Sequence, residues 1–276
     1  MAGRLYVVGT PIGNLGDFSA RGREVLTACD FIAAEDTRVT AKLLARFEIR
    51  RPLVSYHAHN QRDSGEKILA RLLAGEHCAL VTDAGMPAIS DPGELLVRDA
   101  RVRGIAVEAV PGPTAFATAL AVSGMPSGRF CFEGFLSTNT AARRAHIASL
   151  VHETRTLIFY EAPHKLPYTL RDLHKALGDR DMALCRELTK LHEEVLRLTL
   201  GEAVAHVAEH TPRGEYVLVI AGATPQEPVV LTLDDAVALA QAEMAQGASP
   251  TAAAKSAAKQ SGQPRSAIYQ QLTRRA

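Results

Sequence analysis

The chain has 276 residues, 47% of them hydrophobic, so it is long enough to bury one large core or two medium ones. A formal net charge of +1 and the absence of tryptophan exclude a polycationic nucleic-acid binder and a broad aromatic stacking platform. No apolar run approaches the ~20 residues of a membrane span, and the N-terminus lacks a signal-peptide pattern, so we expect a cytoplasmic protein.

The first half of the chain alternates short apolar runs with amphipathic segments. Strands are predicted at residues 5–8, 31–34, 53–56, 78–81 and 105–110, and helices at 19–28, 39–47, 64–73, 94–103 and 115–122. Strands that alternate with helices in this way predict a parallel sheet covered by helices.

Three predicted strands are followed by loops rich in glycine and proline, at residues 9–17, 82–93 and 111–115. Such loops are rigid, and open α/β sheets bind ligands at the carboxyl ends of their strands. We therefore expect the three loops to meet at one crevice, with ordinary strand-to-helix turns as the alternative. The glycine spacing matches neither a dinucleotide fingerprint nor a phosphate-binding P-loop.

The pattern of cysteines and histidines in the sequence gives little indication of a disulfide or a metal site. The four cysteines, Cys29, Cys78, Cys131 and Cys185, are far apart and form no CxxC pair, so we expect reduced core cysteines. The pair His57 and His59 has no third ligand at a matching spacing, so we expect no metal site.

The run Glu35-Asp36-Thr37-Arg38 follows the second predicted strand. Two carboxylates and an arginine at a strand end suit acid–base chemistry or substrate binding. Asp36 or Thr37 also suits the N-cap of the next helix, and the sequence leaves both interpretations open.

The second half starts at a predicted domain boundary near residues 123–128. Strands are predicted at 129–135, 156–160, 182–185, 195–200 and 216–221. Helices are predicted at 141–151 and 202–209, and a further helix is predicted to follow Lys165 and to end at Leu177. Charged residues again follow the strands, either as site residues or as solvated turns: Glu161, Lys165, Arg186, Glu187 and Lys190.

An alanine-rich tail follows a predicted linker at 225–228, with helices at 233–246, 251–261 and 265–274. Ser249 and Pro250 fit an N-cap and first helical position. The tail is expected to be either a helix-turn-helix-like nucleic-acid module or a bundle that packs on the body or on a second copy. The predicted domains are 1–123 and 124–224, both α/β, with 225–276 as linker and helical tail.

Six motifs occur in order: GTPIGNLGD, AEDTR, TDAGMPAISDPG, VPGPTA, YEAPHK and CRELTK with a following HEE. Together they resemble the bacterial small-subunit ribosomal RNA methyltransferase I family of the tetrapyrrole-methylase (class III) superfamily, over residues 5–223. One departure is Lys165, where that family often has arginine; the charge is kept, but the fork that binds phosphate in two places is lost.

This resemblance implies a two-domain tetrapyrrole-methylase-like α/β fold with a cofactor cleft between the domains, plus a small helical C-terminal extension. It also implies an S-adenosylmethionine-dependent homodimer that methylates the ribose 2′-oxygen of a decoding-centre cytidine in 16S rRNA, within the 30S subunit. The family's cofactor contacts map here to Pro11, Ala84, Gly85, Met86, Ile89, Thr114, Ala115, Tyr160, Glu161, Leu188 and Tyr216.

A ribose hydroxyl is a poor nucleophile at neutral pH, so a carboxylate or lysine that accepts its proton, or a cation that stabilises the alkoxide, is expected. The catalytic candidates are Asp36, Arg38, Arg186, Glu187 and Lys190, with Glu35 beside them. Lys190 or Glu187 is favoured for the hydroxyl, and Arg38 and Arg186 for phosphates. A basic face for further phosphates is expected from Arg143, Arg144, Arg180, Arg265, Arg274 and Arg275.

Three rival functions remain. The first is methylation of a tetrapyrrole carbon by the same superfamily, and the second is a non-catalytic RNA-binding protein with a nucleotide-sensing cleft. The third is a Mg²⁺-dependent nucleotide hydrolase that uses Asp36, Asp83 and Asp91. Binding of S-adenosylmethionine without a metal requirement separates the third from the methyltransferase.

Overall fold

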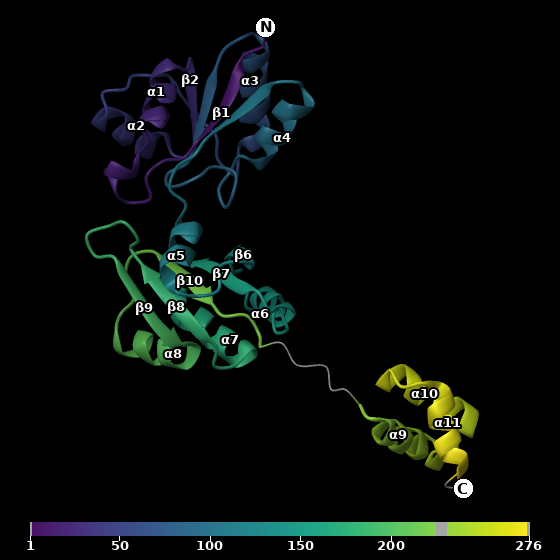
Figure 1. Cartoon of the computed structure of the whole chain (residues 1–276). Coiled ribbons are helices and arrows are strands. Elements are labelled where there is room, and N and C mark those ends of the chain that lie inside the picture. Colours follow the sequence, from purple (N-terminus) through teal and green to yellow (C-terminus); the bar gives the residue numbers. More distant parts are fainter. Residues whose placement is uncertain (1, 225–230, 275–276) are drawn as a thin grey trace. The chain divides into compact units, whose positions relative to one another are not determined.

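The computed structural model describes residues 2–224 and 231–274. The chain divides into a large α/β unit that ends at Ala223 and a helical tail unit (Figure 1). The predicted linker at 225–228 lies outside the described residues. None of the helices in the described part of the chain has the length and apolarity that crossing a bilayer requires.

The first sheet is entirely parallel, as predicted. Its strands lie in the order β3-β2-β4-β1-β5. The bounds are β1 (Arg4–Val8), β2 (Phe31–Ala34), β3 (Leu53–Ser55), β4 (Cys78–Val81) and β5 (Ala106–Val110). All four residues of β2 and of β4 are buried, because helices cover both faces of the sheet.

Side chains of successive strand residues alternate between two hydrophobic cores. Ile32 packs with Leu26 and Leu44 on the side of α1 and α2, whereas Phe31 packs with Ile68 on the side of α3 and α4. Figure 1 shows these two pairs of helices on opposite faces of the sheet. The helices are α1 (Ala20–Ala28), α2 (Thr37–Arg46), α3 (Gln61–Leu73) and α4 (Glu94–Val102), with a short 3₁₀ turn at Leu15–Asp17.

The second sheet is mixed, in the order β6-β7-β10-β8-β9. Only β6 and β7 pair in parallel, and β10 runs antiparallel to both β7 and β8. The bounds are β6 (Phe130–Phe135), β7 (Thr156–Glu161), β8 (Asp181–Arg186), β9 (Glu194–Thr199) and β10 (Tyr216–Ile220). One face packs against α6 (Thr140–Ser149), α7 (Leu166–Leu177) and α8 (Leu200–Glu209).

Helix α5 (Ala115–Ser123) covers the other face of the second sheet. Its Ala119 and Leu120 pack with Ile158 and Val217. The predicted first domain, residues 1–123, includes this helix, whereas its hydrophobic contacts lie on the second sheet. By packing, the chain passes from one sheet to the other at residues 111–114, and the domain boundaries themselves stay predictions.

The tail has three helices, as predicted: α9 (Leu233–Ala245), α10 (Pro250–Ser261) and α11 (Arg265–Arg274). Thr232 and Asp235 form a capping box, and Ser249 caps α10 with Pro250 at its start. The tail has its own core of small side chains, centred on Ala240, Ala254 and Ala257, which lets the helices approach closely.

Candidate active site

The loops that follow β1, β4 and β5 meet at one end of the first sheet, as predicted. Thr10 and Gly85 exchange backbone hydrogen bonds of 2.9 and 3.1 Å. Gly9 lies so close to Gly112 that a Cβ on Gly9 would be 2.7 Å from the Gly112 backbone. Gly85 has a φ of +85°, which an L side chain rarely adopts. Glycine is therefore required where these loops touch.

A pocket of about 410 Å³ lies beside these loops, with walls from both sheets. From the first sheet come Ile12, Glu35 and residues of the loops after β4 and β5; from the second come the ends of β6, β7 and β8 and the start of β10. The lining residues are Ile12, Glu35, Asp83, Ala84, Gly85, Met86, Ile89, Ser90, Asp91, Thr114, Ala115, Phe135, Tyr160, Glu161, Ala162, Pro163, Cys185, Leu188, Glu215, Tyr216 and Val217.

Ten of the eleven residues predicted to contact the cofactor line this pocket. The exception is Pro11, whose neighbour Ile12 lines it instead. Contact of these residues with a cofactor stays a prediction. Residues that the prediction left out include Phe135, Cys185 and Glu215, each at or next to a strand end.

One wall of the pocket is acidic, with Glu35, Asp83 and Asp91. Burial raises the pKa of the Glu35 carboxyl, and the charges of Asp91 and Asp83 raise it further. Burial also raises the pKa values of Asp83 and Asp91. The backbone amide of Asp36 donates to Asp83 Oδ1 over 3.2 Å, which limits the shift at Asp83. Carboxyls with raised pKa values bind and release protons more readily near neutral pH.

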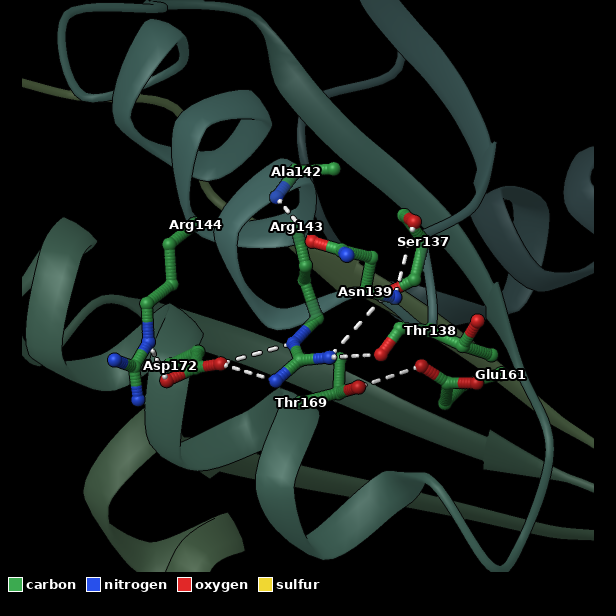
Figure 2. A network of polar contacts seen from close by, with 9 residues as sticks. All are labelled: Ser137, Thr138, Asn139, Ala142, Arg143, Arg144, Glu161, Thr169 and Asp172. Carbon is green, nitrogen blue, oxygen red and sulfur yellow. Dashed lines mark hydrogen bonds and ion pairs between the residues drawn. The ribbon is translucent and has the colours of Figure 1, made fainter.

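Another part of the pocket lining comes from the end of β7. The backbone amide of Phe116 donates to the Tyr160 hydroxyl over 3.0 Å, which ties α5 to β7. Glu161 is buried, and Figure 2 shows its carboxylate accepting a 2.6 Å hydrogen bond from the Thr169 hydroxyl of α7. The amide of Ala162 donates to the other carboxylate oxygen over 2.8 Å. These two bonds fix the position of the Glu161 carboxyl group at the pocket wall.

The predicted catalytic residues lie outside the pocket lining. Asp36 is the N-cap of α2, where it accepts from the Arg38 amide and pairs with the Arg38 guanidinium at 2.6 Å. The hydrogen bond from the Arg38 side chain holds the pKa of Asp36 far below its ordinary value. The capping interpretation of Asp36 is thus confirmed, and its catalytic role stays a prediction.

The segment between β8 and β9 has an unusual backbone. Glu187 and Thr189 have φ values of 53° and 67°, and left-handed backbone at a β-branched residue such as threonine is rare. Lys190 Nζ lies 2.8 Å from a Glu187 oxygen and 2.9 Å from a Glu215 oxygen. A Cβ on Gly13 would lie 2.4 Å from Lys190 Cγ, so this segment packs against the loop after β1.

The charged residues of this segment form ion pairs with carboxylates nearby. The hydrogen bond from Lys190 lowers the pKa of Glu187. Burial lowers the pKa of Lys190, but its bonds to Glu187 and Glu215 outweigh burial and raise it overall. Arg186 pairs with Glu194 at 3.1 Å. Lys190 is therefore a stable cation next to Glu215, which itself lines the pocket.

Two members of the predicted basic face are placed differently from the prediction. Arg143 is buried and bonded to Asp172, and Arg180 donates to the carbonyls of Leu177, Val151 and Ala221. The prediction that Arg143 lies on an exposed face was wrong, because its guanidinium is buried with Asp172, whereas Arg180 is half-buried with its guanidinium bonded to backbone carbonyls. Arg144, Arg265 and Arg274 are exposed. Arg275 lies outside the described residues.

Three of the four cysteines, Cys29, Cys78 and Cys185, are buried as predicted, and Cys131 is half-buried. His57 and His59 lie with ring centroids 6.0 Å apart. Across residues 2–224 and 231–274, no group of three His, Cys, Asp or Glu side chains is arranged to hold a metal ion.

The sequence model of the tetrapyrrole (corrin/porphyrin) methylases matches residues 4–204. The chain belongs to the tetrapyrrole methylase family. This membership confirms the resemblance inferred from the motifs, and it makes the chain a methyltransferase.

Relatives within the family are close in sequence. The methylase is 48% identical over 270 residues to "Ribosomal RNA small subunit methyltransferase I" of Xylella fastidiosa strain Temecula1, covering 97% of this chain and 98% of the relative. The protein of the same name from Thermotoga maritima is 45% identical over 220 residues, which are 80% of this chain and 99% of that relative.

Among solved structures, the methylase is similar in fold to a uroporphyrin-III C-methyltransferase from Thermus thermophilus complexed with S-adenyl homocysteine. The TM-score is 0.55 at 19% identity, covering 79% of this chain and 97% of that one. The predicted two-domain tetrapyrrole-methylase-like fold is confirmed.

Proposed function

We propose that this methylase transfers a methyl group from S-adenosylmethionine to the ribose 2′-oxygen of a decoding-centre cytidine in 16S rRNA. The observation that carries the proposal is the 48% identity, over 98% of its length, to a relative named ribosomal RNA small subunit methyltransferase I. Similarity at this level extends through both sheets and beyond the residues that the family model covers.

The pocket suits S-adenosylmethionine chemically. This cofactor has an apolar-faced adenine and carries positive charge at its sulfonium and ammonium groups, and it supplies a methyl group that is already activated. Apolar side chains such as Met86, Ile89 and Leu188 suit the ring, and the acidic wall suits the cations. The residues that would hold it are the ten predicted lining residues, with Pro11 next to them.

The chain's own task is to align the acceptor and to remove a proton from it. Glu35 is the carboxylate we assign to the ribose hydroxyl, because it lines the pocket and its pKa is raised by burial and by Asp91 and Asp83. A base whose pKa lies nearer to neutral accepts a proton more effectively than a carboxylate whose charged form is stabilised by ion pairs and hydrogen bonds.

The residues favoured from the sequence suit other roles. Glu187 and Lys190 neutralise each other, so neither is a good proton acceptor. Lys190 instead provides a fixed positive charge beside Glu215, able to stabilise a developing alkoxide. Arg38, whose side chain is 86% exposed, and Arg186 remain proposed contacts to RNA phosphates.

We further propose that the substrate is the assembled 30S subunit, that the enzyme is a homodimer, and that it acts in the cytoplasm. The sequence resemblance supports these three statements. A net charge of only +1 supports recognition of an assembled shape, because few phosphate contacts are available to hold naked RNA.

Transfer of labelled methyl from S-adenosylmethionine tests the proposal. Unmodified 30S subunits and naked 16S rRNA are incubated separately with the enzyme, and the RNA is digested to nucleosides. We expect label in 2′-O-methylcytidine from the 30S subunits. Tight cofactor binding without label in either RNA would refute the ribosomal function and point to a tetrapyrrole acceptor.

A further inference from the structure

A second hollow, of about 530 Å³, lies between α6 and α7 on the outer side of the second sheet. Its lining carries the cations Arg143, Arg144, Arg171 and Lys175 against the single carboxylate of Asp172. The hollow therefore has a net charge of +3 in a protein whose whole formal charge is +1.

The base of the hollow is a network of hydrogen bonds and ion pairs centred on Arg143 (Figure 2). Arg143 is 4% exposed and bonds through Nε and a terminal nitrogen to Asp172 Oδ2 at 2.9 and 2.8 Å. Its other terminal nitrogen donates to the carbonyls of Ser137 and Thr138, both over 3.3 Å. The guanidinium also lies 4.5 Å from the centre of the Tyr168 ring. All three guanidinium nitrogens of Arg143 are thus bonded within the protein.

Both carboxylate oxygens of Asp172 accept hydrogen bonds from arginine side chains. Arg144 Nε donates to Asp172 Oδ1 over 3.0 Å, so both carboxylate oxygens are occupied. The Arg144 side chain is 62% exposed, and its two terminal nitrogens have no partner within the described part of the chain. One carboxylate therefore orients two guanidinium groups and leaves one of them able to bind a ligand.

Arg171 and Lys175 complete the cationic rim. Both are exposed, and neither has a hydrogen-bond or ion-pair partner among residues 2–224 and 231–274. They stand four residues apart on α7, with Tyr168 and Asp172 on the same helix face. Like charges at this spacing destabilise an isolated helix, so their positions are costly unless an anion neutralises them.

We propose that this hollow binds a backbone phosphate of the RNA substrate. The inference rests on the proposed function and extends it by naming a docking site away from the pocket. Arginine presents a planar fork that matches phosphate oxygens, and the buried Arg143–Asp172 pair fixes the hollow that Arg144 borders. Exposed cations at the rim of such a hollow bind the phosphate backbone and read no base edge.

The hollow lies on the helix that leads away from the pocket. Ala162 and Pro163 line the pocket, and α7 begins three residues later. Arg171 and Lys175 then follow at roughly 7 and 14 Å along the helix from its first residue, Leu166. A strand of a nucleic-acid duplex carries one phosphate per ~3.4 Å of helix axis, so this length of helix corresponds to about two to four nucleotides. A strand with one ribose at the pocket is long enough to reach the hollow.

The test compares two double variants with the same charge change. Arg171→Gln with Lys175→Gln removes the two rim cations. Lys42→Gln with Arg46→Gln is the matched control, since these are also exposed, unpaired cations four residues apart, on α2. The measurement is the affinity for unmodified 30S subunits at 50 to 200 mM salt, together with cofactor affinity by calorimetry.

We expect the rim variant alone to lose about 1.6 from the log–log salt slope, or 0.7 to 0.9 for each lost phosphate contact. Its affinity then varies about tenfold less than that of the wild type between the two salt concentrations. Cofactor affinity stays unchanged. An unchanged slope, or an equal loss in the α2 control, overturns the phosphate site. Absence of methyl transfer to RNA by the wild type would instead refute the proposed function, so the two failures are distinguishable.

Discussion

The pocket and the hollow of the α/β unit are opposite in charge. Five carboxylates line the pocket, and its described lining has no lysine, arginine or histidine. The hollow between α6 and α7 has four cations and one carboxylate. The difference matches two kinds of ligand: a small cation enclosed between the sheets, and a polyanion that lies along the surface.

The two sites also differ in how their charges are satisfied. In the pocket, burial and mutual repulsion raise the pKa values of Glu35, Asp83 and Asp91. In the hollow, burial raises the pKa of Asp172, but hydrogen bonds from Arg143 and Arg144 outweigh this and lower it. Function at the pocket should therefore respond to pH, and function at the hollow to salt.

The largest expected effect separates Glu35 from its neighbour Asp36. Glu35→Gln removes the proposed proton acceptor, so kcat for methyl transfer should fall about 10²- to 10⁴-fold at saturating RNA and cofactor. Asp36→Asn removes the same charge one residue away and keeps a good N-cap for α2, so it should retain most of the activity. The opposite ranking would refute the assignment of Glu35 and support the role predicted for Asp36 from the sequence.

A smaller effect is expected from the glycines that hold the pocket loops together. In Gly9→Ala the new Cβ meets the Gly112 backbone at 2.7 Å, so the loops after β1 and β5 must separate. Cofactor affinity, measured by calorimetry, should fall tenfold or more, while the salt slope of RNA binding stays unchanged. Gly128→Ala is the control, since a Cβ there meets nothing within 4 Å. Equal losses in the two variants would contradict this account.

The acidic wall predicts a pH dependence that distinguishes substrate from product. As pH falls, carboxyls with raised pKa values take up protons first, and the pocket loses negative charge. S-adenosylmethionine has a cationic sulfur and S-adenosylhomocysteine a neutral one, so only the former loses attraction at its sulfur. The dissociation constant of S-adenosylmethionine divided by that of S-adenosylhomocysteine should therefore rise roughly three- to tenfold as the pH is lowered from 8 to 5. A ratio that does not change with pH would show that the carboxylates lie away from the sulfur.

The smallest effect on the pocket is expected from removal of the tail. The helices from Leu233 onward share a hydrophobic core of their own and form a separate compact unit. A chain that ends at Ala223 should bind the cofactor within about twofold of the full chain. Its affinity for 30S subunits then reports directly on whether the tail is the nucleic-acid module that the sequence suggested.

Local patterns in the sequence were sufficient to predict the strands and the loops that form the pocket. In the first half, alternation of apolar runs with helices predicts a parallel sheet, and parallel strands necessarily bring their carboxyl ends to one edge. The meeting of Gly85 with Thr10 follows from that rule, and the need for glycine at 85 is a local property of its backbone.

Strand direction was the missing information in the second half. Because β10 runs antiparallel to β7 and β8, Tyr216 at its start pairs with Glu161 and Arg186 at the ends of the other two strands. Glu215 therefore reaches the pocket from the position before a strand, whereas site residues were predicted only at positions that follow a strand. Tyr216 itself was predicted only through the family resemblance.

The buried arginine was missed for a related reason. Arg143 and Asp172 are 29 residues apart and meet only when α6 packs beside α7. The sequence shows Arg143 next to Arg144 on one helix, which suggests an exposed basic pair. A detectable signal was the spacing of Tyr168, Arg171, Asp172 and Lys175, which places all four on one face of α7.

The single passage of the chain between the sheets, at residues 111–114, determines how an occupied pocket affects unfolding. Each sheet has separate hydrophobic cores, and the pocket takes its walls from both. A ligand bound there adds a further non-covalent link between the two halves, beside the packing of Lys190 on Gly13, and its binding free energy is lost when either half opens. Cofactor loading thus makes the melting of the two halves cooperative, so that the catalytic unit loses its structure in one step.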